Sequence, residues 1–105
     1  MAWVYLIVAG VFEIIWAVGL KYAQGFTRMG AGAVTIVAML ASFFFLAQAV
    51  KTIPVGTGYA IWTGIGAVGT AAFGIILFSE SASLARLLCI GLIVVGIIGL
   101  KLTSN

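Results

Sequence analysis

Four long apolar runs constrain what this chain of 105 residues can fold into. Short polar segments separate these runs, which extend over residues 2–20, 29–50, 54–78 and 84–102. Each run is close to the roughly 20 residues that an α-helix needs to cross a hydrocarbon core about 30 Å thick. A membrane strand needs only about half that length, and lipid admits only helices and closed barrels. We therefore expect an all-α membrane protein with one four-helix domain over residues 1–105.

Composition supports this class and argues against others. The chain is 65% hydrophobic and 7% charged, whereas a soluble domain carries about a quarter charged residues. Its five basic residues and one of its two acidic residues lie near the ends of the runs, which is typical of topology signals and not of a nucleic-acid-binding face. The sequence has no histidine, no cluster of metal ligands and no nucleophile beside a base. We therefore expect no enzyme, metal or cofactor.

Three residues between the runs are candidates for helix starts. Thr27 is a candidate N-cap of the second helix, and Ser83 of the fourth, because a hydroxyl can accept a hydrogen bond from the first backbone N–H groups. Pro54 suits the first turn of the third helix, where its missing N–H has no cost. These positions predict helices that follow one another through short connections.

One carboxylate, Glu13, lies near the middle of the first run. A charged side chain there costs roughly 3 kcal/mol on insertion scales, and such residues are rarely kept without a use. One interpretation is a buried acid paired with a local donor, but no lysine, arginine or histidine lies in the middle of an apolar run. We favour the alternative, in which Glu13 binds a proton or a cation.

Residues near Glu13 in the first run are compatible with such a site. Gly10 precedes the acid by about one helical turn and Trp16 follows it by about one turn, so the three share one side of the helix. The small residue leaves room beside the carboxylate for a ligand or for another helix.

Other runs contribute polar and aromatic residues at a similar depth. Tyr59 and Trp62 are three residues apart, so both rings can face the same cavity. Ser42 is the most central polar residue of the second run. At 1.5 Å per residue, Ser42 and Trp62 lie about 12 Å, and Glu13 about 16 Å, from the side where the chain starts. Indole and phenol faces attract cations, so this convergence favours a cation site.

The distribution of basic residues leaves the orientation open. Four crossings place Lys21, Arg28 and Arg86 on one side, and Lys51, Lys101 and the amino terminus on the other. Orientation normally follows a clear excess of Lys and Arg on the cytoplasmic side, and here there is almost none. Two predictions remain: a fixed topology with the first and third loops inside, or dual insertion with copies of opposite orientation forming an antiparallel pair.

The sequence resembles the small multidrug resistance family of proton-coupled cation exporters. Glu13 in the first run and residues 54–62, with the sequence PVGTGYAIW, carry this resemblance, which covers the whole chain. The resemblance implies a multi-pass protein of the bacterial inner membrane. It also implies an antiparallel, dual-topology homodimer with one substrate site between two Glu13 side chains.

Within that family the chain is most similar to the guanidinium-exporter branch. Residues 10–16, with the sequence GVFEIIW, place a tryptophan one turn after the acid. The resemblance implies a proton-coupled antiporter in which protons and guanidinium or small guanidinyl cations compete for Glu13. It also implies a site lined by Gly10, Trp16, Ser42, Tyr59 and Trp62.

Other functions stay open at this stage. One is a broader exporter of quaternary ammonium and multidrug cations in the same family. A proton-carrying structural subunit, such as a rotor-ring component, would also bury one carboxylate among glycine-rich helices. A membrane assembly partner without transport is the third alternative.

Overall fold

The computed structural model describes residues 1–24 and 28–103, which form four α-helices. These are α1 (Ala2–Ala23), α2 (Met29–Ala49), α3 (Val55–Phe78) and α4 (Leu84–Thr103). All four are long and apolar enough to cross a membrane. No strand occurs among the described residues. The predicted all-α membrane architecture is therefore confirmed.

Two helix ends differ from the predicted ones for local reasons. α1 continues past Leu20 to Ala23 and ends where Gln24 adopts a left-handed conformation, with φ of 48°. Pro54 is the N-cap of α3 and not its first helical residue. The reason is its ψ of 137°, which is extended, so α3 begins at Val55.

The start of α4 follows the sequence-based prediction. The backbone N–H of Arg86 donates a hydrogen bond of 3.3 Å to the Ser83 hydroxyl, which is the geometry of an N-cap. The Leu87 N–H bonds the Ser83 carbonyl at 3.0 Å. Thr27, the predicted cap of α2, lies outside the described residues, and Arg28 occupies the N-cap position.

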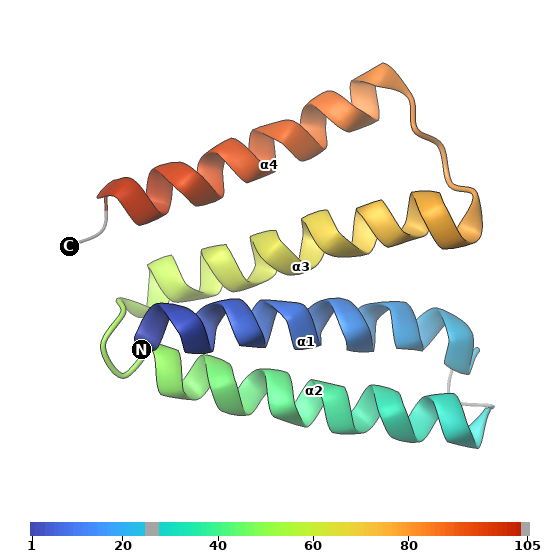
Figure 1. Ribbon diagram of the computed structural model, residues 1–105, viewed down its shortest axis with the longest axis horizontal. Coiled ribbons are helices and arrows are strands. Elements are labelled where there is room, and N and C mark those ends of the chain that lie inside the picture. Colours follow the sequence, from blue (N-terminus) through green and yellow to red (C-terminus); the bar gives the residue numbers. More distant parts are fainter. Residues whose placement is uncertain (25–27, 104–105) are drawn as a thin grey trace.

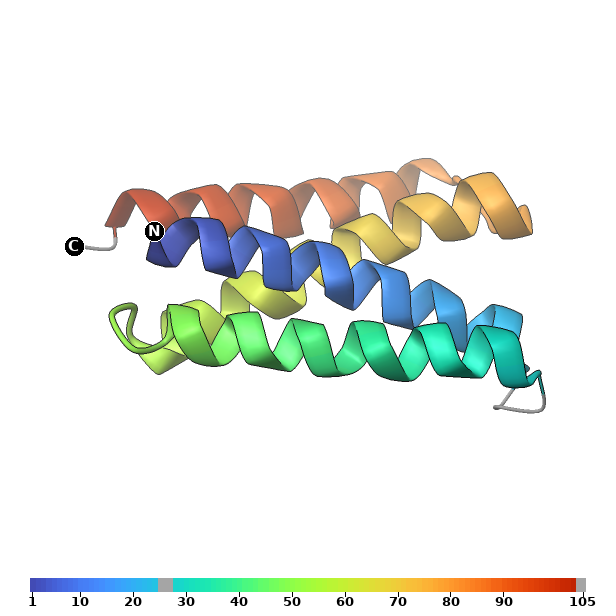
Figure 2. The ribbon, with the colours of Figure 1, turned by 60° about the horizontal axis from the view of Figure 1, so that its bottom comes forward.

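α1 lies between α2 and α3 in the folded molecule (Figure 1). It packs against both α2 and α3, while α4 packs against α3. Figure 2, a view turned by 60°, again shows α2 and α4 at opposite edges of the molecule. The buried core forms around α1 and α3 near the end where the chain starts, and its residues are Leu6, Ala9, Ala49, Ile53, Ile61 and Trp62. Residues of α1 can therefore form a site together with residues of α2 and of α3.

α4 is the least enclosed helix. None of its residues is buried, and Leu88, Leu92 and Val95 are each more than 60% exposed. An apolar surface of this kind is compatible with contact to lipid or to a second chain, and would be unfavourable in water.

The helix directions distribute the basic residues over the two ends of the molecule. α1 and α3 end where α2 and α4 begin, and α2 and α4 end at the other end of the molecule, where α1 and α3 begin (Figure 1). Arg28 and Arg86 therefore lie at the first end with Lys21, whereas Lys51 and Lys101 lie at the second. The near-even tally of charge counted along the sequence also holds for the folded chain.

Candidate functional site

A groove of about 490 Å³ between α1 and α3 contains Glu13. The residues that line it come from the second half of α1, from one face of α3, from the connection after α3 and from the start of α4: Glu13, Ala17, Val18, Lys21, Thr63, Gly66, Ala67, Thr70, Ala71, Gly74, Phe78, Glu80 and Arg86. The groove therefore extends from the middle of the membrane span to the end where α3 meets α4. Its lining residues therefore connect that end with Glu13.

The Glu13 carboxyl group packs directly on α3. It lies against the backbone of Gly66, where a Cβ atom would overlap the carboxylate. Glu13 Oε1 is buried and has no hydrogen-bond partner among the residues that the structure describes. The hydroxyl of Thr70, in the same groove, is also buried without a partner in this part of the chain.

Unpaired polar atoms of this kind have a direct chemical consequence. A buried acceptor without a partner is costly, and an isolated buried charge costs more. Glu13 and Thr70 line one groove, so a proton bound there would satisfy the carboxylate, and a cation with several N–H groups has donors for both oxygens. The groove is therefore suited to binding a small donor-rich cation.

A second polar cluster joins three helices. Trp62 on α3 donates its indole N–H to the Ser42 hydroxyl on α2 at 2.9 Å. Ser42 in turn donates to the backbone carbonyl of Ala9 on α1 at 2.7 Å. Ser42 and Trp62 are both buried, and the sequence placed them at the same depth. Ala9 lies one turn before Glu13 on the same face of α1, so the cluster positions the helix that carries the acid.

The remaining predicted residues differ in their surroundings. The Tyr59 ring lies 5.6 Å from that of Trp62, as their spacing predicts, but Tyr59 is 57% exposed. Trp16 is partly buried, and its indole nitrogen has no partner among the described residues. Gly10 is buried against Ile65 of α3.

Of the six predicted site residues, Glu13 alone is among those lining the groove. Ser42, Tyr59 and Trp62 form the neighbouring cluster. Depth along the helices placed Ser42 and Trp62 together correctly, but depth carries no information on which way each helix is turned. That these residues form one site remains a prediction.

Sequence reasoning missed the α3 wall of the groove. Thr63, Gly66, Thr70 and Gly74 line it, and they recur at helical spacing of three or four residues. This stripe of small and polar side chains was a usable signal. Arg86 was interpreted only as a topology signal, yet it also lines the groove.

The comparisons with known proteins identify the family. Residues 1–93 match the model of the Small Multidrug Resistance protein family. This chain belongs to the small multidrug resistance family. It is 62% identical to a guanidinium exporter from Yersinia pseudotuberculosis. The match extends over 104 residues, which are 99% of this chain and 100% of the relative. It is 58% identical over 105 residues, the full length of both proteins, to a guanidinium exporter from Citrobacter freundii.

Family membership and the helices settle the coarse assignment. The chain is a multi-pass protein of the bacterial inner membrane. The resemblance to the small multidrug resistance family is confirmed. The relatives are named as exporters, which is a class of transporter and not of enzyme.

The link between Ser42 and Trp62 predicts a measurable coupling. Hydrogen bonds between membrane helices contribute on average about 0.6 kcal/mol and at most about 1.7 kcal/mol. We expect Ser42→Ala and Trp62→Phe each to lower the free energy of unfolding. Because each change removes the same hydrogen bond, the double variant should lose about 0.5–1.5 kcal/mol less than the sum. Reversible unfolding in mixed micelles measures this, and strictly additive losses would show that the bond contributes nothing.

Proposed function

We propose that this protein exports guanidinium and small guanidinyl cations in exchange for protons. The observation that carries the proposal is the buried Oε1 of Glu13, which has no partner among the described residues and lies in a groove that reaches the end of the helices. Full-length relatives named guanidinium exporters support the choice of substrate.

The chemistry of exchange follows from one carboxylate with two competing ligands. Ionised Glu13 attracts a cation, whereas protonated Glu13 is neutral and holds it poorly. Guanidinium suits this acceptor because its planar N–H groups can bond a carboxylate bidentately. The Thr70 hydroxyl, also unpaired among the described residues, supplies a further acceptor. Since proton and cation use the same oxygens, binding of one releases the other.

We also propose that two copies of the chain assemble antiparallel and pair their Glu13 side chains. Nearly equal basic charge at the two ends of the molecule supports insertion in both orientations. The exposed apolar surface of α4 supports contact with a second chain. Alternating access would then open the shared site to each side of the membrane in turn.

In this assembly Gly10, Trp16, Ser42, Tyr59 and Trp62 line the substrate site around Glu13. The exposed ring of Tyr59 supports this role, as does the indole nitrogen of Trp16, which has no partner among the described residues. Both groups retain the capacity to contact a substrate or a second chain. Aromatic faces beside a carboxylate would stabilise a bound cation.

Removing the carboxylate tests the central step. Purified protein in proteoliposomes should accumulate guanidinium when a proton gradient is imposed, and Glu13→Gln should abolish this exchange because the amide cannot carry the charge. Glu13→Asp is the matched control, since it keeps a carboxylate and should retain coupled exchange at a reduced rate. Coupled transport by Glu13→Gln at the wild-type rate would contradict the mechanism.

The same assay separates the alternative functions. Equal transport of tetraethylammonium and guanidinium would favour a broader exporter of multidrug cations. Proton flux that is independent of any cation would favour a proton-carrying structural subunit. Absence of both fluxes would favour an assembly role.

Acidification should weaken cation binding. A proton that competes at one carboxylate raises the apparent Kd for guanidinium by up to about tenfold for each unit fall in pH, once the protonated form predominates. The sign follows because protonated Glu13 has no charge to offer the cation. Quenching of tryptophan fluorescence by guanidinium between pH 5 and 9 measures the Kd. A Kd that does not change over this range would refute direct competition.

The contact between Glu13 and α3 predicts a specific effect of Gly66→Ala. The added methyl group must displace the flexible carboxyl group, so we expect guanidinium to bind about tenfold more weakly, within the range that overpacking costs. Gly56→Ala on the same helix is the matched control, because a Cβ atom there meets no atom within 4 Å. Equal affinity of the two variants would show that Gly66 does not position the acid.

A further inference from the structure

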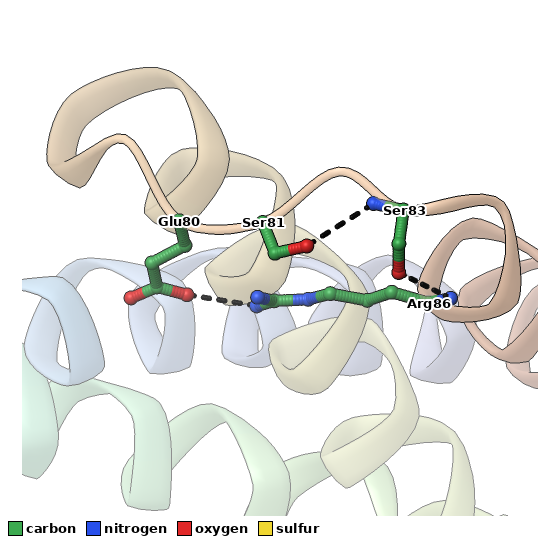
Figure 3. Close-up of polar contacts among 4 residues, drawn as sticks. All are labelled: Glu80, Ser81, Ser83 and Arg86. Carbon is green, nitrogen blue, oxygen red and sulfur yellow. Dashed lines mark hydrogen bonds and ion pairs between the residues drawn. The ribbon is translucent and has the colours of Figure 1, made fainter.

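At the end of the groove away from Glu13, the guanidinium group of the Arg86 side chain is paired with a second carboxylate, that of Glu80. Arg86 Nη2 lies 2.7 Å from Glu80 Oε1 (Figure 3). The two side chains are 34% and 42% exposed, respectively. Both also line the groove that contains Glu13. The groove therefore has one carboxylate in its interior and a second carboxylate at its mouth.

The backbone holds Glu80 in place independently of Arg86. Ser79 ends α3 in a left-handed conformation, with φ of 55°, and the Glu80 N–H then bonds the Gly74 carbonyl at 3.2 Å. The Glu80 carboxylate packs on Gly74, where a Cβ atom would lie 2.6 Å from Oε1. This turn and this close approach keep the carboxylate at the groove when the arginine side chain leaves.

Arg86 is held in a different way. The Ser83 cap anchors its backbone at the start of α4, but its guanidinium group reaches Glu80 through a flexible side chain and one hydrogen bond from Nη2. Partly exposed ion pairs of this kind contribute about 0–1 kcal/mol. Another guanidinium ion can therefore replace Arg86 on Glu80 at little cost.

Electrostatics at the mouth also single out Glu80. Lys21 lies there with its ammonium group 5.6 Å from the centre of the Phe78 ring, and Lys21 and Arg86 both line the groove. A cation approaching Glu13 from this end must pass these two positive charges. Among the described residues of the groove, Glu80 is the carboxylate placed to offset them.

We propose that Glu80 is a second cation-binding carboxylate, where guanidinium entering or leaving the groove displaces the Arg86 side chain. The choice of ligand rests on the proposed function. The residues of α1 at the two levels, Glu13 and Lys21, are about 12 Å apart along the helix axis, so the mouth site is distinct from the interior one. It acts on the rate at which guanidinium reaches Glu13 and not on the affinity of Glu13 itself.

Transport by two variants gives opposite results under this proposal. Glu80→Gln removes the mouth carboxylate and should lower kcat/KM for guanidinium by about two- to fivefold, the range that a partly exposed ion pair supports. Arg86→Gln frees Glu80 and should raise kcat/KM by a similar factor. Arg28→Gln is the matched control: it removes the same charge from the same end of the molecule, but Arg28 is not among the residues that line the groove, so its kcat/KM should stay near that of the wild type. Equal losses in Glu80→Gln and Arg86→Gln would indicate a structural clamp and overturn the proposal.

A binding measurement isolates the mouth site from the interior one. Glu13→Gln protein labelled with 15N-arginine is titrated with guanidinium, and the side-chain Nε signals are followed by NMR. The Arg86 signal should shift to saturation, while Arg28, the other arginine of the chain, serves as the internal reference. Adding Glu80→Gln should abolish the shift, and tetramethylammonium should cause little shift because it has no N–H donors.

The two proposals fail in different ways. An Arg86 signal that does not respond to guanidinium, or that responds equally without the Glu80 carboxylate, overturns the mouth site. Absence of guanidinium transport by the wild-type protein, together with a saturable shift of Arg86, overturns the proposed export function and leaves the mouth site standing.

Discussion

The hydrocarbon core offers no water to a buried carboxylate, and the rest of this structure depends on how that constraint is met at Glu13. The acid lies in the middle of α1, at the depth where an unpaired carboxylate is most costly. Its Oε1 nevertheless has no hydrogen-bond partner within the described part of the chain. Gly66 of α3 has no side chain and so leaves room for the carboxyl group of Glu13. The groove makes this carboxyl group accessible from one end of the molecule. The fold thus maintains an unsatisfied acceptor where a ligand can reach it.

The other buried polar groups nearby show the opposite arrangement. Trp62 donates a hydrogen bond to Ser42, and Ser42 donates one to the α1 backbone, which ties α1, α2 and α3 together close to the acid. Their hydrogen bonds give the bundle a defined register, because lipid supplies no competing partner. Rigid support beside a free carboxylate is what a site needs if a small cation is to find the same geometry in every cycle.

The groove contains two carboxylates that differ in their partners. Glu80 accepts a hydrogen bond from the guanidinium group of Arg86, whereas Glu13 Oε1 has no hydrogen-bond partner in the part of the chain that the structure describes. The first pair demonstrates within the chain the interaction that the proposed substrate would make with the second acid. The exposed apolar surface of α4 and the exposed ring of Tyr59 further suggest that one chain is only part of the working unit, in line with the proposed dimer.

The sequence by itself determined the elements: four apolar runs of membrane-spanning length become helices because lipid requires each segment to satisfy its own backbone. The sequence also indicated that Glu13 has a function, because a carboxylate inside the membrane costs free energy. It further predicted Ser83 as the N-cap of α4. Only the tertiary structure decided that Gly66 underlies Glu13, that Ser42 bonds Trp62 and that Glu80 and Arg86 lie at the mouth of the same groove. Because these helices are apolar on most faces, hydrophobic periodicity does not fix how each one is turned, and the stripe from Thr63 to Gly74 marks one face of α3 without showing which helix it meets. Packing between distant segments sets that rotation.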